Sequence, residues 1–235
     1  MSHDPTESEP IEPEGPDDEH VPELDAETRE RRSLALAQVR RFGDPLLRSP
    51  ASPVTDFGAE LAEDAERMVA LMRDALGVGL AATQLGVMRR LLVFQAGPDA
   101  TPTAIANPQI EWRSEIAEIA EEGCLSLPGI VVDVERPLHV RVSGRDAIGE
   151  PLRIEASGLE ARVLQHEVDH LDGVLMIDRA ERDQRRGALR ALREGTAYSP
   201  EPDQPGTDEA ELAGGNGGSG RPVGRDAAEH AQAPR

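Results

Sequence analysis

The sequence predicts an α+β domain with short, mostly antiparallel β-sheets. Residues 104–144 are rich in β-branched side chains that partly alternate with polar ones, and this pattern favours strands over helices. Segments with apolar residues at helical spacing precede this region at 56–76 and follow it at 159–171 and 181–193. Strands that are grouped together and flanked by helices are typical of an α+β domain.

The first predicted helix follows Asp56 and ends at Gly77. Its apolar residues recur at helical spacing, at Phe57, Leu61, Met68, Leu71, Met72 and Leu76. The segment 77–84 is too rich in glycine and alanine for an ordinary helix interior, and indicates a close approach of the backbone to a ligand or to another backbone. A buried strand is expected next, at 91–94.

The second half of the domain is predicted to contain strands followed by two helices. Residues 131–134 and 138–142 are β-branched and partly alternating, which indicates two strands. A turn at 149–151 separates the second of them from a third strand at 152–154. The helix at 159–171 then carries the residues on which the functional interpretation depends.

Composition indicates that part of the chain does not fold. The 235 residues carry a formal net charge of −20, with 38% hydrophobic and 2% aromatic residues, which is lean for a fully folded chain. Acidic residues and prolines crowd the first 30 positions, and a glycine-rich stretch of low complexity lies near the other end. We expect a disordered acidic extension at 1–31, a folded domain at 32–195 and a disordered Gly/Pro-rich tail at 196–235.

Cysteine usage and hydropathy point to the cytoplasm. The single cysteine cannot form an internal disulfide, which favours a reducing compartment. The first residues lack the basic and apolar regions of a signal peptide, and no run approaches the roughly 18 apolar residues that span a bilayer. We therefore expect a cytoplasmic protein without membrane contact.

A His-Glu-x-x-His pattern at 166–170 indicates a metal site. His166 and His170 are four residues apart, so both imidazoles project from one helix face and can reach one ion. Glu167 projects nearby, where it can accept a proton from water at the ion. The alternative is a pair of surface histidines beside ordinary charges.

The only cysteine, Cys124, supplies the third expected ligand. A lone cysteine is often a small buried hydrophobic residue, and that interpretation holds for Cys124 if it is taken by itself. Together with two histidines, however, a thiolate leaves one tetrahedral position open. An open position is typical of catalytic sites, whereas structural sites are closed.

In its order of motifs the sequence resembles the peptide deformylase family. The motifs are Gly-Val-Gly-Leu-Ala-Ala-Thr-Gln at 77–84, Glu-Gly-Cys-Leu-Ser at 122–126 and His-Glu-Val-Asp-His at 166–170. The similarity extends over about residues 41–194 and leaves out the acidic head and the glycine-rich tail. It implies a catalytic domain whose sheets pack around a central helix carrying the His-Glu-x-x-His pattern, followed by a basic C-terminal helix.

The resemblance implies a metal-dependent hydrolase that removes the N-formyl group from the formylmethionine of new polypeptides and releases formate. It implies one ion per chain, held by Cys124, His166 and His170, with Fe²⁺ as the physiological ion and Zn²⁺, Ni²⁺ or Co²⁺ able to replace it. Glu167 would move the proton. The side-chain amide of Gln84 and the backbone N–H of Leu125 would stabilise the oxyanion.

The resemblance also implies that an extended N-formylmethionyl peptide lies near Val78, Gly79 and Gly123. Helical spacing adds Leu159, Arg162 and Val163, which precede His166 on its own face of the helix. Leu159 and Val163 suit a slot for the methionine side chain. Arg162 is unexpected in an apolar slot, so we expect its methylene stem to line the slot and its guanidinium to reach solvent.

Three charged features outside the ligand set also carry expectations. Glu122 would be costly if buried without a partner, and Arg136 is its expected partner. Asp169 is either a hydrogen-bond acceptor behind the metal ligands or a solvated helix residue. The last helix is basic, with Arg179, Arg182, Arg185, Arg186, Arg190 and Arg193. These arginines are either a solvated face or, as the resemblance implies, a contact with ribosomal RNA.

Two other functions remain open from the residues. A metallopeptidase with the same helix would take its third ligand C-terminal to that helix and would keep its ion without Cys124. A catalytically silent binding protein on the same scaffold would release no formate. Such copies usually lose a ligand, the glutamate or the glutamine, and all five residues are present here.

Overall fold

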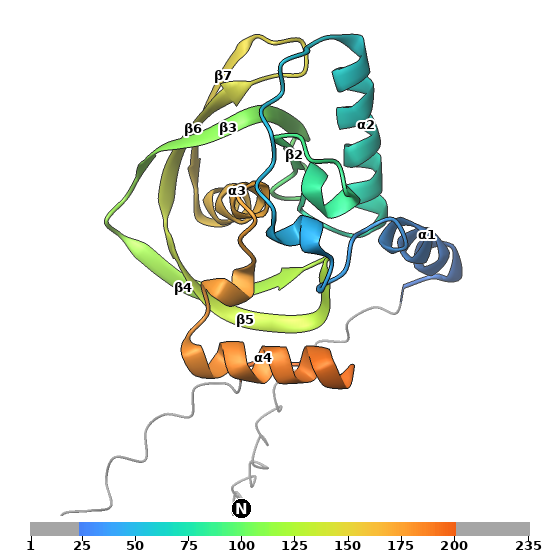
Figure 1. The fold of residues 1–235 in the computed structure, drawn as a ribbon. Helices are drawn as coiled ribbons and strands as arrows, with labels where there is room; N and C mark the ends of the chain where they lie inside the picture. Colours follow the sequence, from blue (N-terminus) through green and yellow to red (C-terminus); the bar gives the residue numbers. More distant parts are fainter. Residues whose placement is uncertain (1–23, 201–235) are drawn as a thin grey trace, which may run out of the picture. The chain divides into compact units, whose positions relative to one another are not determined.

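The computed structural model describes residues 24–200, and the fold is given for that part of the chain. Four α-helices and three short 3₁₀ helices lie along it (Figure 1). The α-helices are α1 (Ala26–Leu36), α2 (Ala59–Asp74), α3 (Gly158–Leu171) and α4 (Arg182–Glu194). The 3₁₀ helices are η1 (Pro45–Arg48), η2 (Ala82–Leu85) and η3 (Met176–Asp178).

Seven strands form two antiparallel sheets. The strands are β1 (Gly79–Ala81), β2 (Leu91–Phe94), β3 (Thr103–Arg113), β4 (Ala117–Cys124), β5 (Leu127–Pro137), β6 (His139–Arg145) and β7 (Pro151–Ser157). The larger sheet has the order β1-β2-β3-β6-β7, and β4 pairs with β5 in a hairpin of its own. The predicted fold class, α+β with short antiparallel sheets, is confirmed.

Helix α3 is central, between the larger sheet and the β4–β5 hairpin (Figure 1). Its apolar side packs into a cluster with the larger sheet through Ala161, Leu164, Val168 and Leu171. Its other side carries buried polar residues that meet the hairpin. Buried polar residues on such a helix destabilise the fold unless each forms a hydrogen bond or an ion pair.

Gly173 ends α3 and shows why a glycine stands there. Its φ of +75° is in the left-handed region, which side chains with a Cβ disfavour. A Cβ at this position would also lie 2.7 Å from the backbone oxygen of Arg48. The chain can therefore turn tightly from α3 towards η3 and α4, and α4 packs on β5.

Most predicted elements appear within a few residues of their expected bounds, but both domain boundaries move outward. The expected boundary at residue 32 lies inside α1, because Asp25 caps that helix by accepting hydrogen bonds from the backbone N–H and hydroxyl of Thr28. At the other end the chain stays attached past 195, since the N–H of Tyr198 donates to the oxygen of Gly129 at 2.8 Å. The rest of the two predicted disordered segments, 1–23 and 201–235, lies outside the described residues.

Among residues 24–200, none of the helices has the length and apolar character needed to cross a bilayer.

Candidate metal centre

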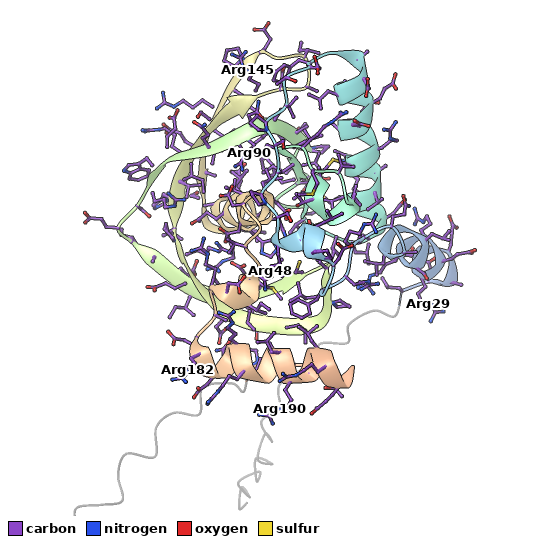
Figure 2. The ribbon with its side chains drawn as sticks, viewed as in Figure 1. Arg29, Arg48, Arg90, Arg145, Arg182 and Arg190 are labelled. Carbon is purple, nitrogen blue, oxygen red and sulfur yellow. The ribbon has the colours of Figure 1, made fainter. Side chains whose placement is uncertain are left out.

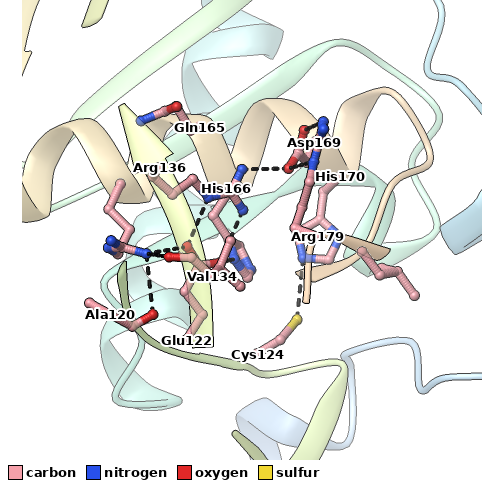
Figure 3. Close-up of polar contacts among 12 residues, drawn as sticks. Ala120, Glu122, Cys124, Val134, Arg136, Gln165, His166, Asp169, His170 and Arg179 are labelled. Carbon is pink, nitrogen blue, oxygen red and sulfur yellow. Dashed lines mark hydrogen bonds and ion pairs between the residues drawn. The ribbon is translucent and has the colours of Figure 1, made fainter. Parts of the chain in front are cut away.

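Cys124, His166 and His170 meet at one point, although the cysteine and the histidines come from different elements. The two imidazoles project from α3 with ring centroids 4.9 Å apart, and the Nε2 of His170 lies 3.2 Å from the sulfur of Cys124 (Figure 3). A shift of register between Gly123 and Cys124, at the end of β4, allows the cysteine to leave the ladder. One ligand atom from each of the three residues lies within 4.8 Å of the others.

This donor set fits a single divalent ion. Bonds of about 2.0–2.3 Å from nitrogen and sulfur place tetrahedral ligand atoms roughly 3.5 Å apart, close to the observed Cys124–His170 separation. Burial raises the pKa of the Cys124 thiol, but the charges of His170 and His166 and their hydrogen bonds outweigh burial and hold the pKa well below its usual range. This shift favours the thiolate, the form that binds metal.

Glu167 lies next to His166 with its carboxylate enclosed by protein. Its Oε2 is buried and has no hydrogen-bond partner among residues 24–200, which is costly unless the atom serves a ligand. Burial raises the pKa of Glu167 to about 7, against the lowering effect of the charges on His166 and His170. A carboxylate with such a pKa can both accept and release a proton near neutral pH.

The backbone of β1 closes one side of the Glu167 carboxylate. A Cβ on Gly79 would lie 2.8 Å from the Cδ of Glu167, closer than carbon atoms approach in folded proteins. A side chain at this position would therefore have to displace the Glu167 carboxylate. The expected close approach in the segment 77–84 is found between β1 and α3.

Gln84 turns its side chain towards the sulfur from η2. Its Oε1 accepts a hydrogen bond from the backbone N–H of Ala81 at 2.9 Å, which fixes the orientation of the amide. Its Nε2 donates to the hydroxyl of Ser126 at 3.2 Å and approaches the sulfur of Cys124 at 3.6 Å. The amide donor thus lies beside the metal ligands. Leu125, between Cys124 and Ser126, lines the same cavity.

Glu122 is buried, and its carboxylate contacts two guanidinium groups and one imidazole. It accepts hydrogen bonds from Arg136 at 2.8 and 3.0 Å and from Arg162 at 3.0 Å (Figure 3). Its Oε2 also lies 2.9 Å from the Nδ1 of His166, which leaves the Nε2 of that ring for an ion. Burial would raise the pKa of Glu122, but the hydrogen bonds from Arg136 and His166 outweigh it and lower the pKa to about 2.

The expected pair of Glu122 and Arg136 is present, and it is part of a longer chain of charges. Arg136 also donates to Asp169 at 2.7 Å, and Asp169 accepts from Arg179 at 2.7 Å on its other oxygen. Asp169 is therefore a buried acceptor for two arginines, and the interpretation as a solvated residue is wrong. The network ties α3 to the β4–β5 hairpin behind the metal ligands.

Replacing Arg136 with alanine is expected to destabilise the protein by about 3–5 kcal/mol, because the buried carboxylates of Glu122 and Asp169 lose a partner. Equilibrium unfolding in urea measures this change. The molecules that remain folded are expected to keep most of their metal. Arg141→Ala is the matched control, since Arg141 pairs with Glu155 on an exposed surface and should cost about 0.2–1 kcal/mol. Loss of the ion without loss of stability would contradict a structural role for Arg136.

A cavity of about 400 Å³ opens onto the metal centre. Of the twelve residues predicted for the site, all but His170 line it. Leu159 and Val163 form part of its wall, Leu159 largely exposed and Val163 buried. Val78, Gly79 and Gly123 also line it, as the interpretation of an extended substrate requires.

The expectation for the Arg162 guanidinium is wrong. The side chain is only 9% exposed, and the guanidinium turns inward. It donates to Glu122 and to the backbone oxygens of Val134 at 2.8 Å and Glu118 at 2.8 Å. These acceptors lie on the hairpin, and they satisfy the charge better than a partly exposed position beside the slot would.

Sequence reasoning missed two contacts of the site: the hydrogen bond from Gln84 to Ser126 and the one between Glu122 and His166. The signal for the second was an acidic residue two positions from the predicted cysteine ligand. An imidazole that binds metal usually uses its other nitrogen with a carboxylate or carbonyl, so a nearby carboxylate was the group to consider.

Comparisons with known proteins agree with this geometry. The family described as polypeptide deformylase matches residues 36–186. A peptide deformylase of Acidothermus cellulolyticus is 46% identical over 161 residues, 68% of this chain and 88% of that protein. The crystal structure of a Synechococcus elongatus peptide deformylase in complex with actinonin is similar with a TM-score of 0.63 and 42% identity, over 68% of this chain and 88% of that one. The Thermotoga maritima enzyme structure gives a TM-score of 0.59 and 46% identity, over 61% and 96%.

Proposed function

The chain belongs to the polypeptide deformylase family, and from this membership we propose how its own residues perform the reaction. The protein is a hydrolase that removes the N-formyl group from the formylmethionine of new polypeptides. The observation that carries the proposal is the convergence of Cys124, His166 and His170 beside a buried carboxylate.

We assign Cys124, His166 and His170 as ligands of one divalent ion per chain. Fe²⁺ is the proposed physiological ion, and Zn²⁺, Ni²⁺ or Co²⁺ would fit the same thiolate and imidazole donors. When bound, the ion supplies Lewis acidity that activates water and polarises the formyl carbonyl. Glu122 holds the ring of His166 in the orientation that ligation needs.

Glu167 is proposed as the group that moves the proton. Its carboxylate accepts a proton from the attacking water and then gives it to the amine nitrogen of the departing peptide. Its lack of a hydrogen-bond partner leaves Oε2 available to water, and its raised pKa suits both transfers.

Gln84 and Leu125 are proposed to stabilise the oxyanion that forms on the formyl oxygen. Ala81 and Ser126 hold the Gln84 amide in place, and its contact with the sulfur is long, so the N–H on that side is available to the substrate. The backbone N–H of Leu125 would supply the second donor. Each such donor typically contributes about 3 kcal/mol to the transition state.

The substrate is proposed to lie extended along Val78, Gly79 and Gly123, with its methionine side chain between Leu159 and Val163. An apolar wall suits a thioether chain. Arg162 contributes its stem alone to this wall, because its guanidinium is bound to the hairpin.

Formate release tests the proposed function directly. Protein prepared anaerobically with Fe²⁺ is expected to release one formate per formyl-Met-Ala-Ser and to expose a free amine. Mass spectrometry detects the loss of the formyl group, and a formate dehydrogenase assay gives the rate. A protein that binds this peptide without releasing formate would be a silent binding protein instead.

Helix α4 is proposed to contact ribosomal RNA, and the protein is proposed to act in the cytoplasm, where new chains emerge. Arg179, Arg185 and Arg186 are paired with aspartates. In contrast, Arg182, Arg190 and Arg193 form no ion pair among residues 24–200, and Figure 2 shows Arg182 and Arg190 on the side of α4 away from β5. Unpaired cations on one exposed face are suited to phosphate contacts.

Changing Arg182, Arg190 and Arg193 together to glutamate is expected to weaken ribosome binding and to lower its salt dependence by up to about three in the log–log slope. Sedimentation with ribosomes at several salt concentrations measures both. The control changes three exposed arginines on other elements, Arg67, Arg113 and Arg153. Equal weakening by both triple variants would mean that net charge, and not α4, governs binding.

A further inference from the structure

Helix α1 contributes to the cavity although it lies almost entirely before the segment that the family shares. The family match begins at residue 36, whereas Arg32 and Leu36 both line the cavity together with Cys124 and Glu167. These two residues are four apart, so they project from the same face of α1. The substrate cleft of this chain therefore has a wall that comes from its own N-terminal helix.

This wall is fixed to the catalytic residues. Ala35 and Val39 are buried beneath α1 and the turn that follows it. The backbone N–H of Arg40 donates to the oxygen of Gln84 at 2.6 Å, and that of Phe42 donates to the oxygen of Ser126 at 2.9 Å. Two backbone hydrogen bonds thus join the turn after α1 to residues beside Cys124, so the end of α1 is anchored next to the cleft.

Of the two arginines that line the cleft, Arg32 is the one whose guanidinium has no partner among residues 24–200. Among residues 24–200, two arginines line the cavity, and the guanidinium of Arg162 is buried against Glu122 and backbone oxygens. Arg32 is exposed and forms no ion pair or hydrogen bond with the described residues. The other charged groups that line the cavity besides the metal ligands are the carboxylates of Glu121, Glu122 and Glu167.

The balance of charge gives Arg32 a specific effect. Glu122 is neutralised by its arginine partners, but Glu121 is exposed on the cleft wall, so an acidic peptide meets a like charge as it approaches. A free guanidinium on the wall offsets this repulsion locally and can donate two hydrogen bonds to a carboxylate. The proposed methionine slot is on α3, whereas Arg32 is on α1, so Arg32 lines a different part of the cavity wall from that slot.

We propose that Arg32 is a specificity-determining residue that favours substrates with a carboxylate C-terminal to the formylmethionine. This inference rests on the proposed function, since it concerns the same cleft. The carboxylate is either an acidic side chain or the C-terminal carboxylate of a short peptide. Leu36, one turn along on the same face, adds an apolar side chain to this wall.

The experiment compares kcat/KM for matched peptides. Glutamate and glutamine are exchanged in turn at the second, third and fourth positions of formyl-Met peptide amides, and one glutamine peptide is also made with a free C-terminus. For the wild-type protein, at least one carboxylate peptide is expected to be favoured over its neutral partner by about threefold, the effect of one exposed charge pair. The free C-terminus separates the two sources of the carboxylate.

Arg32→Gln is expected to remove this preference, and Arg32→Glu to reverse it, a change of about tenfold in the ratio. The difference should appear mainly in KM and diminish in 0.5 M KCl, because the cleft wall is exposed. Arg29→Glu is the matched control. It makes the same charge change one turn earlier on α1, at an exposed residue that does not line the cavity (Figure 2).

The outcomes distinguish the inference from the proposed function. If the neutral peptides release formate but no carboxylate position responds to Arg32→Glu more than to Arg29→Glu, the role of Arg32 is wrong and the function stands. If no peptide releases formate, the proposed function itself fails. Thermal unfolding of each variant checks that the substituted α1 is still folded.

Discussion

Glu167→Gln is expected to lower kcat for formate release by about 10²- to 10⁴-fold, the usual contribution of a positioned proton-transfer group. Glutamine has nearly the same shape as glutamate but cannot accept the proton of the attacking water. The buried position of Glu167 leaves no room for a bulk base to replace it. Steady-state kinetics with formyl-Met-Ala-Ser measure the effect.

Metal content separates this role from a structural one. The Glu167→Gln protein should hold as much Fe²⁺ as the wild type, since the three proposed ligands are unchanged. Glu160→Gln, in the first turn of the same helix and outside the cavity, is the control and should retain full activity. A Glu167→Gln protein with near-normal kcat would refute the assignment of the proton carrier.

Cys124→Ala is expected to abolish both stoichiometric metal binding and formate release. Two imidazoles on one helix turn hold a divalent ion weakly, and the third donor of the proposed set is this sulfur. Elemental analysis after dialysis and the formate assay measure the two losses. His139→Ala is the control, because His139 is exposed and lies outside the cluster.

The same variant decides between the deformylase assignment and a metallopeptidase. A metallopeptidase that takes its third ligand C-terminal to α3 would keep its ion when Cys124 is removed. Cys124→Ala protein that remains fully metallated would therefore show that the sulfur is not a ligand. Far-UV circular dichroism should show an intact fold in either case.

Local sequence predicted the part of the site that depends on helix geometry alone. His166, Glu167 and His170 lie as their spacing requires, since i and i+4 positions share a face in any α-helix. Helix geometry does not place Cys124 beside the two histidines. It lies more than 40 residues away on β4, so its place beside the histidines was predicted from the chemistry of a thiolate with two imidazoles and from the resemblance in the order of motifs, and not from spacing.

Arg162 shows what residue spacing leaves open. Its position on the face of His166 was predicted, but the direction of a long side chain depends on acceptors in other elements. Here those acceptors are Glu122 and backbone oxygens of the β4–β5 hairpin. The hydrogen bond between Glu122 and His166 was missed for the same reason, as it joins residues 44 apart in the chain.

The start of the folded part was misplaced because composition hid a helix cap. Acidic residues continue to Glu30, and their density suggested one uniform extension. Asp25 and Thr28 form a cap within it, and the apolar side of α1 is small. Composition averages over a window and does not register a single capping residue.

The close approach of Gly79 to Glu167 also bears on how this enzyme can change over evolution or in the laboratory. Any side chain at residue 79 would push the carboxylate out of its place, so the strand proposed to hold the substrate and the proposed proton carrier cannot vary independently. Efforts to broaden substrate range should therefore leave β1 unaltered and concentrate on the opposite walls, formed by α1 and the first turns of α3. On those walls the exposed residues Arg32 and Leu159 can accept new side chains without displacing the buried partners of His166.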